Sequence, residues 1–357
     1  MNTIGVPMDH HYIDRRTGAA VRETFRADRS VGLLYDRLRE SAPALFRALT
    51  GRRACALLGH LGYDRRPGPR GIPLFQHMGI DWRECLHPAD TFVSPRQVFE
   101  RQIRYWDCRP MEENPDTVVA PADSRLLCGE LAETPALFVK EKFFTTGELL
   151  GPGSSWAELF NRGSYAVFRL TPDKYHYNHA PVAGTVVDLY TLDGSYHSCN
   201  PRAVLALASL HARNRRVVTV IDTDLPGGTG VGLVAMIEVV ALMIGDIVQC
   251  VSTHHYDHPR PLARSMRLAK GAPKSLFRPG SSTVILLFQQ GAVRFSDDLV
   301  HNLARVDVPS RFSAGLGRPL VETEVRVSET IARRKPLGPA PPPAAPPAPG
   351  PSSMEDT

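Results

Sequence analysis

The chain has 357 residues, of which 43% are hydrophobic and 22% are charged, so it can bury a substantial core in one large domain or two modest ones. Its 42 basic and 37 acidic residues leave a net charge of +5, which is too small to indicate a nucleic-acid partner but is compatible with an anionic membrane surface. The six cysteines form no CxxC pair and no signal peptide is recognisable, which favours reduced thiols in the cytoplasm.

The first predicted elements are short helices. Apolar residues recur at three- and four-residue spacing between residues 31 and 49, with Arg37, Arg39 and Arg47 around them. Pro43 is expected to divide this stretch, because proline cannot donate the internal hydrogen bond of a helix. The amphipathic face that results either packs on its own domain or lies in the interface of a membrane, and the pattern is compatible with both.

A second helix is predicted after residue 94. Ser94 can cap it and Pro95 suits the first helical position, while apolar residues continue at helical spacing from Val98 to Trp106. This segment is expected to be structural.

The pattern changes to short β-branched runs near residue 117. Strands are predicted at residues 117–119, 136–139, 165–170, 184–189, 217–221, within 231–247 and at 283–288. The run from 231 to 248 is barely long enough for a membrane span and contains Glu238 and Asp246, so buried strands are favoured. The glycine-rich residues 226–230 lack the lysine of a P-loop and are interpreted as a hairpin loop.

These elements predict an α+β fold. Residues 1–115 form a helical N-terminal region that associates with membranes, and residues 116–330 form a mainly β catalytic domain. Residues 331–357 are rich in proline and alanine and are expected to be a disordered tail.

One turn precedes the last predicted strand. Pro279 and Gly280 lead into Ser281, Ser282 and Thr283, so a serine lies where the backbone bends at the start of an apolar run. A serine hydroxyl is nearly inert at neutral pH unless an imidazole, held in the right tautomer by a carboxylate, activates it.

Two histidine clusters could supply such an imidazole or bind a metal. His176 and His179 are three apart on an extended segment and therefore point to opposite faces. His254, His255 and His258 surround Asp257, but the prolines that follow favour a surface loop over a metal site.

The chain resembles the phosphatidylserine decarboxylase family over roughly residues 10–325. The family's Tyr-His-x-x-His motif is matched at Tyr175, His176 and His179, its Pro-Ala-Asp motif at residues 121–123, and its Gly-Ser-Thr motif at residues 281–283. The Asn200 and Asn214 segments also fit the family, although both could be ordinary turn-forming residues.

The resemblance implies a proenzyme that cuts itself. Ser282 would be the nucleophile, His179 the base and Asp123 the acid that orients it, while His176 would serve the decarboxylation. Ser282 would become a pyruvoyl group, an electrophilic carbonyl that no ordinary side chain offers, at the head of a small α chain cut from a large β chain. The mature enzyme would convert phosphatidylserine to phosphatidylethanolamine in phospholipid biosynthesis, as a peripheral protein on the cytoplasmic face of the cell membrane.

Several residues depart from the family pattern. Ser281 stands where the family has glycine before the reacting serine. The cut is therefore expected between Ser281 and Ser282, or between Gly280 and Ser281 if the alignment with the family motif shifts by one residue. The sequence also departs from the family pattern at Ser124, Val240, Pro273 and Ser275. Two alternatives stay open, namely a pyruvoyl-dependent decarboxylase of a soluble amino acid and an uncleaved, non-catalytic lipid-binding relative.

Overall fold

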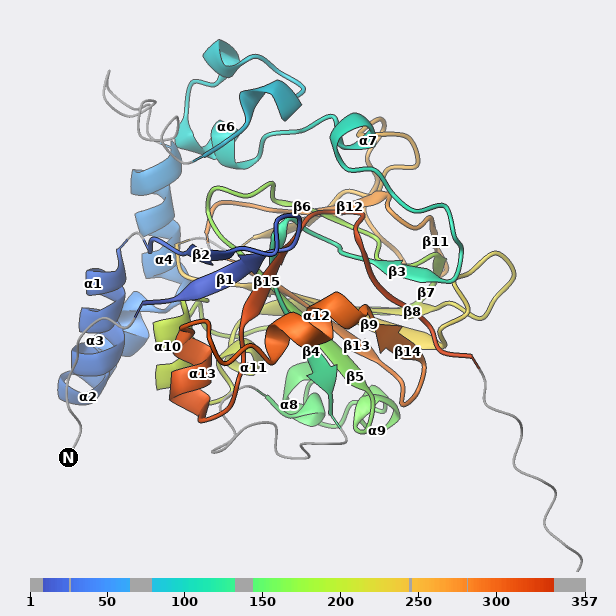
Figure 1. Cartoon of the computed structure of the whole chain (residues 1–357). Helices are drawn as coiled ribbons and strands as arrows, with labels where there is room; N and C mark the ends of the chain where they lie inside the picture. Colours follow the sequence, from blue (N-terminus) through green and yellow to red (C-terminus); the bar gives the residue numbers. More distant parts are fainter. Residues whose placement is uncertain are drawn as a thin grey trace, which may run out of the picture.

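A large, mostly antiparallel sheet runs through the protein (Figure 1). The computed structural model describes residues 9–25, 27–64, 79–131, 144–243, 246–280 and 282–336. The strands of the large sheet follow the order β11 (Arg267–Leu268), β7 (Gly184–Leu192), β8 (Arg216–Asp222), β9 (Leu233–Val240), β13 (Ser282–Phe288), β5 (Ser164–Leu170), β4 (Ser124–Glu130), β15 (Glu322–Val325), β1 (His11–Asp14) and β2 (Ala20–Arg22). Among these pairs, β1 and β15 are parallel.

Two small antiparallel sheets accompany the large one. The first has the order β10 (Ile247–Gln249), β12 (Pro273–Phe277) and β6 (Tyr177–His179), and the second has the order β14 (Val293–Phe295), β16 (Thr330–Arg334) and β3 (Thr117–Val119).

Strand β13 separates two hydrophobic cores because successive side chains point to opposite faces. Val284, Leu286 and Phe288 pack in a core that includes residues of both small sheets. Ile285 and Leu287 pack in a second core with residues of the helices. Ser282 has the same parity as Val284, so its side chain belongs to the face covered by the small sheets.

Helices of residues 28–64 stack along one side of the molecule (Figure 1). They are α1 (Asp28–Gly32), the π-helix η1 (Leu33–Leu38), α2 (Arg39–Ser41), α3 (Pro43–Leu49), α4 (Arg52–Gly59) and the π-helix η2 (His60–Asp64). The predicted break at Pro43 is confirmed, since this residue begins α3. None of the helices in the described ranges is long and apolar enough to cross a bilayer.

The remaining helices are short. They are η3 (Trp82–Glu84), η4 (Ala89–Thr91), α6 (Pro95–Phe99), α7 (Tyr105–Cys108), α8 (Thr146–Leu150), α9 (Trp156–Phe160), α10 (Pro201–Ala206), α11 (Leu210–Arg213), α12 (Asp297–Leu303) and α13 (Arg311–Leu316). The predicted cap is confirmed, because the Ser94 hydroxyl accepts a hydrogen bond from the Gln97 amide. The predicted extension to Trp106 is wrong, since α6 ends at Phe99 and Trp106 lies in α7.

The α+β class is confirmed, and most predicted strands appear within one or two residues of their expected bounds. Residues 231–247 contain β9 and the start of β10, and the glycine-rich residues 226–230 join β8 to β9 as a hairpin. The strand predicted at 136–139 and the part of the predicted tail beyond residue 336 lie outside the described residues. Residues 331–334, predicted as the start of that tail, belong instead to β16. The N-terminal region differs from the prediction, because β1 and β2 belong to the large sheet.

Candidate active site

Ser282 is the first residue of β13 and lies between Leu170 of β5 and Val240 of β9. The residue is only 2% exposed, and its hydroxyl has no hydrogen-bond partner within the described part of the chain. Gly280 approaches it with a φ of 144°, a backbone conformation that residues with a Cβ rarely adopt. The neighbouring Ser281, predicted as the other cleavage residue, lies outside the described residues.

Two connections between sheets bring His176 to the same end of the strands as Ser282. The chain passes from β5 to β6 and from β12 to β13, and these strands pair as β5 with β13 and β6 with β12. The Phe277 amide donates to the His176 carbonyl across the two connections (3.0 Å). His179, by contrast, lies at the far end of β6 opposite Pro273.

The His176 ring is buried and neutral. Its Nδ1 is 2.8 Å from the Lys174 carbonyl, which can only accept, so Nδ1 carries the proton and Nε2 is left as an acceptor. This Nε2 has no partner among the described residues, and the ring stacks on Phe99 at 3.6 Å. Burial first, and the charge of Arg101 next, lower the pKa of His176 to about 3.

His179 is also buried, but both of its ring nitrogens have partners. Nδ1 lies 2.7 Å from the Gly271 carbonyl and Nε2 lies 2.9 Å from the Tyr175 hydroxyl. Burial lowers the pKa of His179 to about 4. Its backbone amide donates to the Pro121 carbonyl (2.8 Å), which brings the Pro-Ala-Asp segment beside it.

Asp123 is held by an arginine. Arg109 donates to both carboxylate oxygens (3.0 and 2.6 Å) and the Val327 amide donates to one of them (2.8 Å). Although burial raises the pKa of Asp123, the charge and hydrogen bonds of Arg109 outweigh it and the pKa is lowered. Among the described contacts, Asp123 and His179 share no hydrogen bond, and Ser282 has no partner, so these residues do not form a linked triad. Asp123 lies close enough for its charge to act on both His176 and His179.

Arg101 is a buried cation to which the sequence motifs assigned no role. Its guanidinium donates to the carbonyls of Val98 (3.1 Å) and Asp173 (2.6 Å), and the charges of Asp123, Asp173 and Glu84 act on it from farther away. Burial lowers its pKa. Burying a charge is costly, and perturbed buried charges cluster at functional sites.

A buried polar network also lies on the Ser282 face, and no sequence pattern indicated its pairing. Glu238 forms an ion pair with Lys274 (2.7 Å), both fully buried, and accepts hydrogen bonds from Asn178, Ser275 and Gln249. These partners come from β6, β12 and β10, whereas Glu238 lies on β9. The network therefore connects the first small sheet to the large sheet. Its central residue, Glu238, is two residues before Val240, which lies opposite Ser282.

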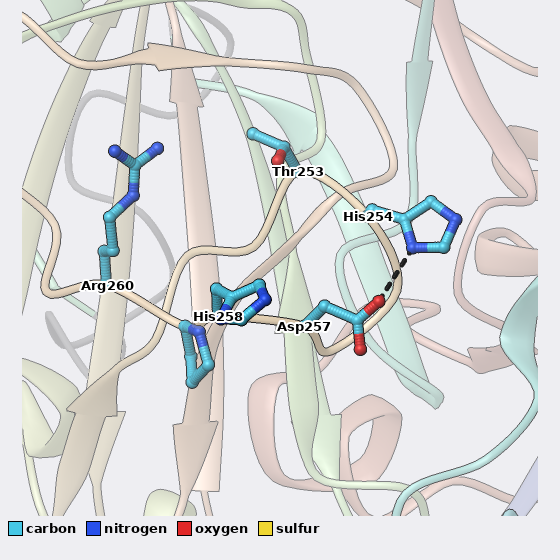
Figure 2. A pocket seen from close by; sticks show the side chains of 6 residues that line it. Thr253, His254, Asp257, His258 and Arg260 are labelled. Atoms are coloured by element: carbon cyan, nitrogen blue, oxygen red, sulfur yellow. Dashed lines mark hydrogen bonds and ion pairs between the residues drawn. The ribbon is translucent and has the colours of Figure 1, made fainter.

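The second histidine cluster forms an exposed loop. Residues of this loop line a surface hollow of about 580 Å³, in which His254 and Asp257 form a hydrogen-bonded pair (2.9 Å; Figure 2). Three potential metal-ligand atoms come together elsewhere in the described chain, at His10, Glu23 and Glu322. Arg169 binds both of those carboxylates, which accounts for the cluster as a buried ion-pair network.

Comparison with known proteins agrees with this geometry. The model of the family described as phosphatidylserine decarboxylase matches residues 96–314. A phosphatidylserine decarboxylase proenzyme of Chlamydia felis is 30% identical over 316 residues, covering 87% of this chain and 98% of the relative. One from Fusobacterium nucleatum is 26% identical, covering 82% and 91%. The proenzyme 3 of Schizosaccharomyces pombe is 28% identical over 90% of this chain, which spans only 30% of that longer protein.

Proposed function

Because the chain belongs to the phosphatidylserine decarboxylase family, we propose that it is a proenzyme that cuts itself before Ser282 and then converts phosphatidylserine to phosphatidylethanolamine. The Ser282 hydroxyl carries this proposal. It is buried, has no hydrogen-bond partner among the described residues, and stands where the family motif has its reacting serine. The enzyme is a carboxy-lyase.

Self-cleavage needs only the chain's own atoms and one water. The Ser282 oxygen attacks the Ser281 carbonyl carbon, and the C–N bond breaks as the new C–O ester bond forms. The hydroxyl proton passes to a base and then to the released amine. Elimination of the ester frees the Ser281 carboxylate and leaves dehydroalanine, which hydrolyses with loss of ammonia to a pyruvoyl group.

The residue roles follow the family motifs. His179 is the base, Asp123 the acid that orients the site, and His176 a proton carrier in the decarboxylation. His179 Nε2 already contacts the Tyr175 hydroxyl. It therefore accepts the serine proton either by relay through that hydroxyl or after its contact with the hydroxyl has broken. His176 suits proton transfer because its Nε2 is an unprotonated, buried acceptor.

The surroundings of Ser282 suit a pyruvoyl group. When present, such a group supplies a carbonyl that accepts electrons during loss of carbon dioxide. The backbone of β13 would hold it between β5 and β9, with His176 at the same end of the strands. Arg101 provides a buried positive charge, hydrogen-bonded to carbonyl groups, that is close enough to act on His176, which suits a substrate with anionic groups.

The helices of residues 28–64 suit an anionic membrane surface on the cytoplasmic side. Exposed leucines lie among exposed arginines there, at Leu33, Leu45, Leu57, Leu58, Leu61, Arg29, Arg37, Arg47, Arg52 and Arg53. Apolar contact with the lipid and attraction to anionic headgroups reinforce each other. This surface would bring the active site to its lipid substrate.

Denaturing electrophoresis with intact mass measurement tests the cleavage. We expect fragments of 281 and 76 residues, with the small one lighter by one ammonia than a chain that begins with serine. Ser282→Ala should remain a single chain, whereas Ser281→Ala should still be cut. An uncut wild-type chain contradicts the proposal and favours a non-catalytic lipid-binding protein.

Vesicle sedimentation and product analysis test the substrate. The cleaved protein should sediment with phosphatidylserine-containing vesicles and form phosphatidylethanolamine in them. Leu57→Glu should weaken sedimentation, while Leu225→Glu, at an exposed leucine of the β8–β9 loop, should not. Cleavage without vesicle binding, together with carbon dioxide release from a free amino acid, would assign the enzyme a soluble substrate instead.

A further inference from the structure

A continuous chain of hydrogen-bonding contacts runs through His179. The Gly271 carbonyl lies 2.7 Å from His179 Nδ1, and His179 Nε2 lies 2.9 Å from the Tyr175 hydroxyl. The Tyr175 hydroxyl lies 2.7 Å from that of Tyr256, which lies 2.8 Å from the Ile103 carbonyl. These four contacts are called the tyrosine chain below.

The tyrosine chain is one proton short when His179 is neutral. Each of the four contacts needs one proton, and the carbonyl groups at both ends can only accept. A neutral imidazole brings one proton and each of the two tyrosines brings one, which makes three. One of the four contacts then has no proton, so the lone pairs of its two atoms face each other. A protonated His179 brings the missing fourth proton and completes all four hydrogen bonds.

Burial favours the neutral form of His179. It lowers the pKa most strongly, whereas the hydrogen bond to the Gly271 carbonyl and the charge of Asp123 raise the pKa, and the charge of Arg109 lowers it. Tyr105 adds a ring edge at 4.6 Å from the imidazole, and its phenol is uncharged at neutral pH. His179 is thus neutral at rest, yet its charged form gains a hydrogen bond that the neutral form lacks. This combination suits a base that holds a proton briefly.

Tyr256 is held firmly enough to play such a part. The Ile103 amide donates to its hydroxyl (3.2 Å), and its ring packs on Tyr105 and Tyr177. The next residue back, His255, stacks on Trp106 at 3.6 Å. The loop whose outer side carries His254 and Asp257 (Figure 2) therefore turns Tyr256 inward, toward Tyr175.

We propose that Tyr256, acting through Tyr175, is a positioning residue that stabilises the proton-bearing state of His179 during self-cleavage. The inference rests on the proposed role of His179 as the base. The proton leaves the Ser282 hydroxyl, resides on the imidazole while the C–O bond forms, and passes to the amine when the C–N bond breaks. No proton is gained or lost over the cycle.

Tyr256→Phe tests the proposal. Without the Tyr256 hydroxyl, two contacts remain, from His179 to the Gly271 carbonyl and to the Tyr175 hydroxyl, and a neutral His179 and Tyr175 supply the two protons that these need. Protonating His179 then completes no further hydrogen bond, so the histidine becomes a weaker base. Self-cleavage of freshly synthesised chains should slow by about ten-fold. The fall in rate on acidification should also move to lower pH, because the pKa of His179 drops. A merely structural change would slow cleavage without changing the pH at which the rate falls.

Two further variants complete the test. Tyr177→Phe removes a neighbouring phenol that bonds Gln102 (3.2 Å), outside the tyrosine chain, and should cleave at the wild-type rate. Tyr175→Phe breaks the chain one link earlier and should shift the pH profile as Tyr256→Phe does, which preserves the test if Tyr256→Phe fails to fold. Wild-type rate and pH profile in a folded Tyr256→Phe or Tyr175→Phe would overturn the inference and leave the proposed function intact. An uncut wild-type chain would instead overturn the proposed function.

Discussion

Arg101 places a buried positive charge next to the proposed chemistry. Its guanidinium is bound only by carbonyl groups among the described residues, and its charge helps to keep the pKa of His176 low, after burial. The charge thereby helps to keep His176 unprotonated at every pH near neutrality. Sequence patterns cannot reveal this, because an arginine followed by a polar residue is usually exposed.

Arg101→Met should raise the pKa of His176, because the methionine side chain fills space without charge. A histidine NMR titration of the uncut Ser282→Ala protein measures this. Arg104→Met is the matched control, since Arg104 also donates to carbonyl groups, those of Cys85 and Arg83, but does not contribute to the pKa of His176. An unchanged His176 titration in Arg101→Met would contradict the assignment.

Among the elements, the contact between β9 and the first small sheet depends on one buried ion pair. Glu238 and Lys274 are both fully buried, and three polar side chains complete the network around the carboxylate. Removing one member of such a pair leaves an uncompensated charge, which costs about 3–5 kcal/mol. Removing both need not be costly.

Lys274→Met should therefore lower the free energy of unfolding by about 3–5 kcal/mol, whereas the double variant Lys274→Met/Glu238→Gln should recover much of that loss. Urea unfolding in the Ser282→Ala background measures both, and Glu238→Gln alone closes the double-mutant cycle. Equal losses in Lys274→Met and in the double variant would show that the pair does not act as a unit.

Elements were predictable where local pattern decides them. Pro43, Ser94 and the β-branched runs carry their own backbone signals, and the structure places helix starts and strands there. Strands β1 and β2 were missed because they are short, and they join the large sheet through the pairing of β1 with β15, some 300 residues away. The partners of Glu238 were missed for the same reason, since they come from three separate strands.

The candidate site was predictable only in part. The family motifs predicted Asp123, His176, His179 and Ser282 as one site, but sequence could not reveal which group each side chain contacts. Arg109 binds Asp123, and Tyr175 and Gly271 bind His179, so the roles assigned to these residues stay predictions. Such contacts depend on the meeting of distant segments, which no spacing encodes.

At the scale of the whole molecule, buried neutral histidines should make stability depend on pH. The pKa values of His176, His179, His197 and His211 are lowered by burial from about 6.5 to about 3 for the first and about 4 for the others. Below pH 6.5 these histidines bind protons in the unfolded chain but stay unprotonated in the folded chain. Stability is therefore full above pH 6.5 and falls as the pH approaches 4, by up to about 1.4 kcal/mol per pH unit for each histidine.

Urea unfolding of the uncut Ser282→Ala protein between pH 7.5 and pH 4.5 should reveal this loss. His211→Gln should reduce the slope by about one proton. Constant stability across this range would contradict the neutral, buried state of these histidines.

The two fragments should remain together after the cut. The smaller fragment supplies β13 between β5 and β9, β15 between β4 and β1, and β16 between β14 and β3. A tag on the large fragment should retain the small one in buffer and release it only in denaturant. Loss of the small fragment under native conditions would contradict this interleaving.

The position of β13 has a consequence for the lifetime of the mature protein. Before the cut, one continuous polypeptide finds its fold by an intramolecular search whose rate does not depend on concentration. Afterwards, two separate pieces must meet before the central strand can return, so recovery from denaturation becomes a bimolecular reaction that dilution suppresses. Heat or urea should thus inactivate the finished enzyme permanently in dilute solution, while the Ser282→Ala precursor renatures under the same conditions.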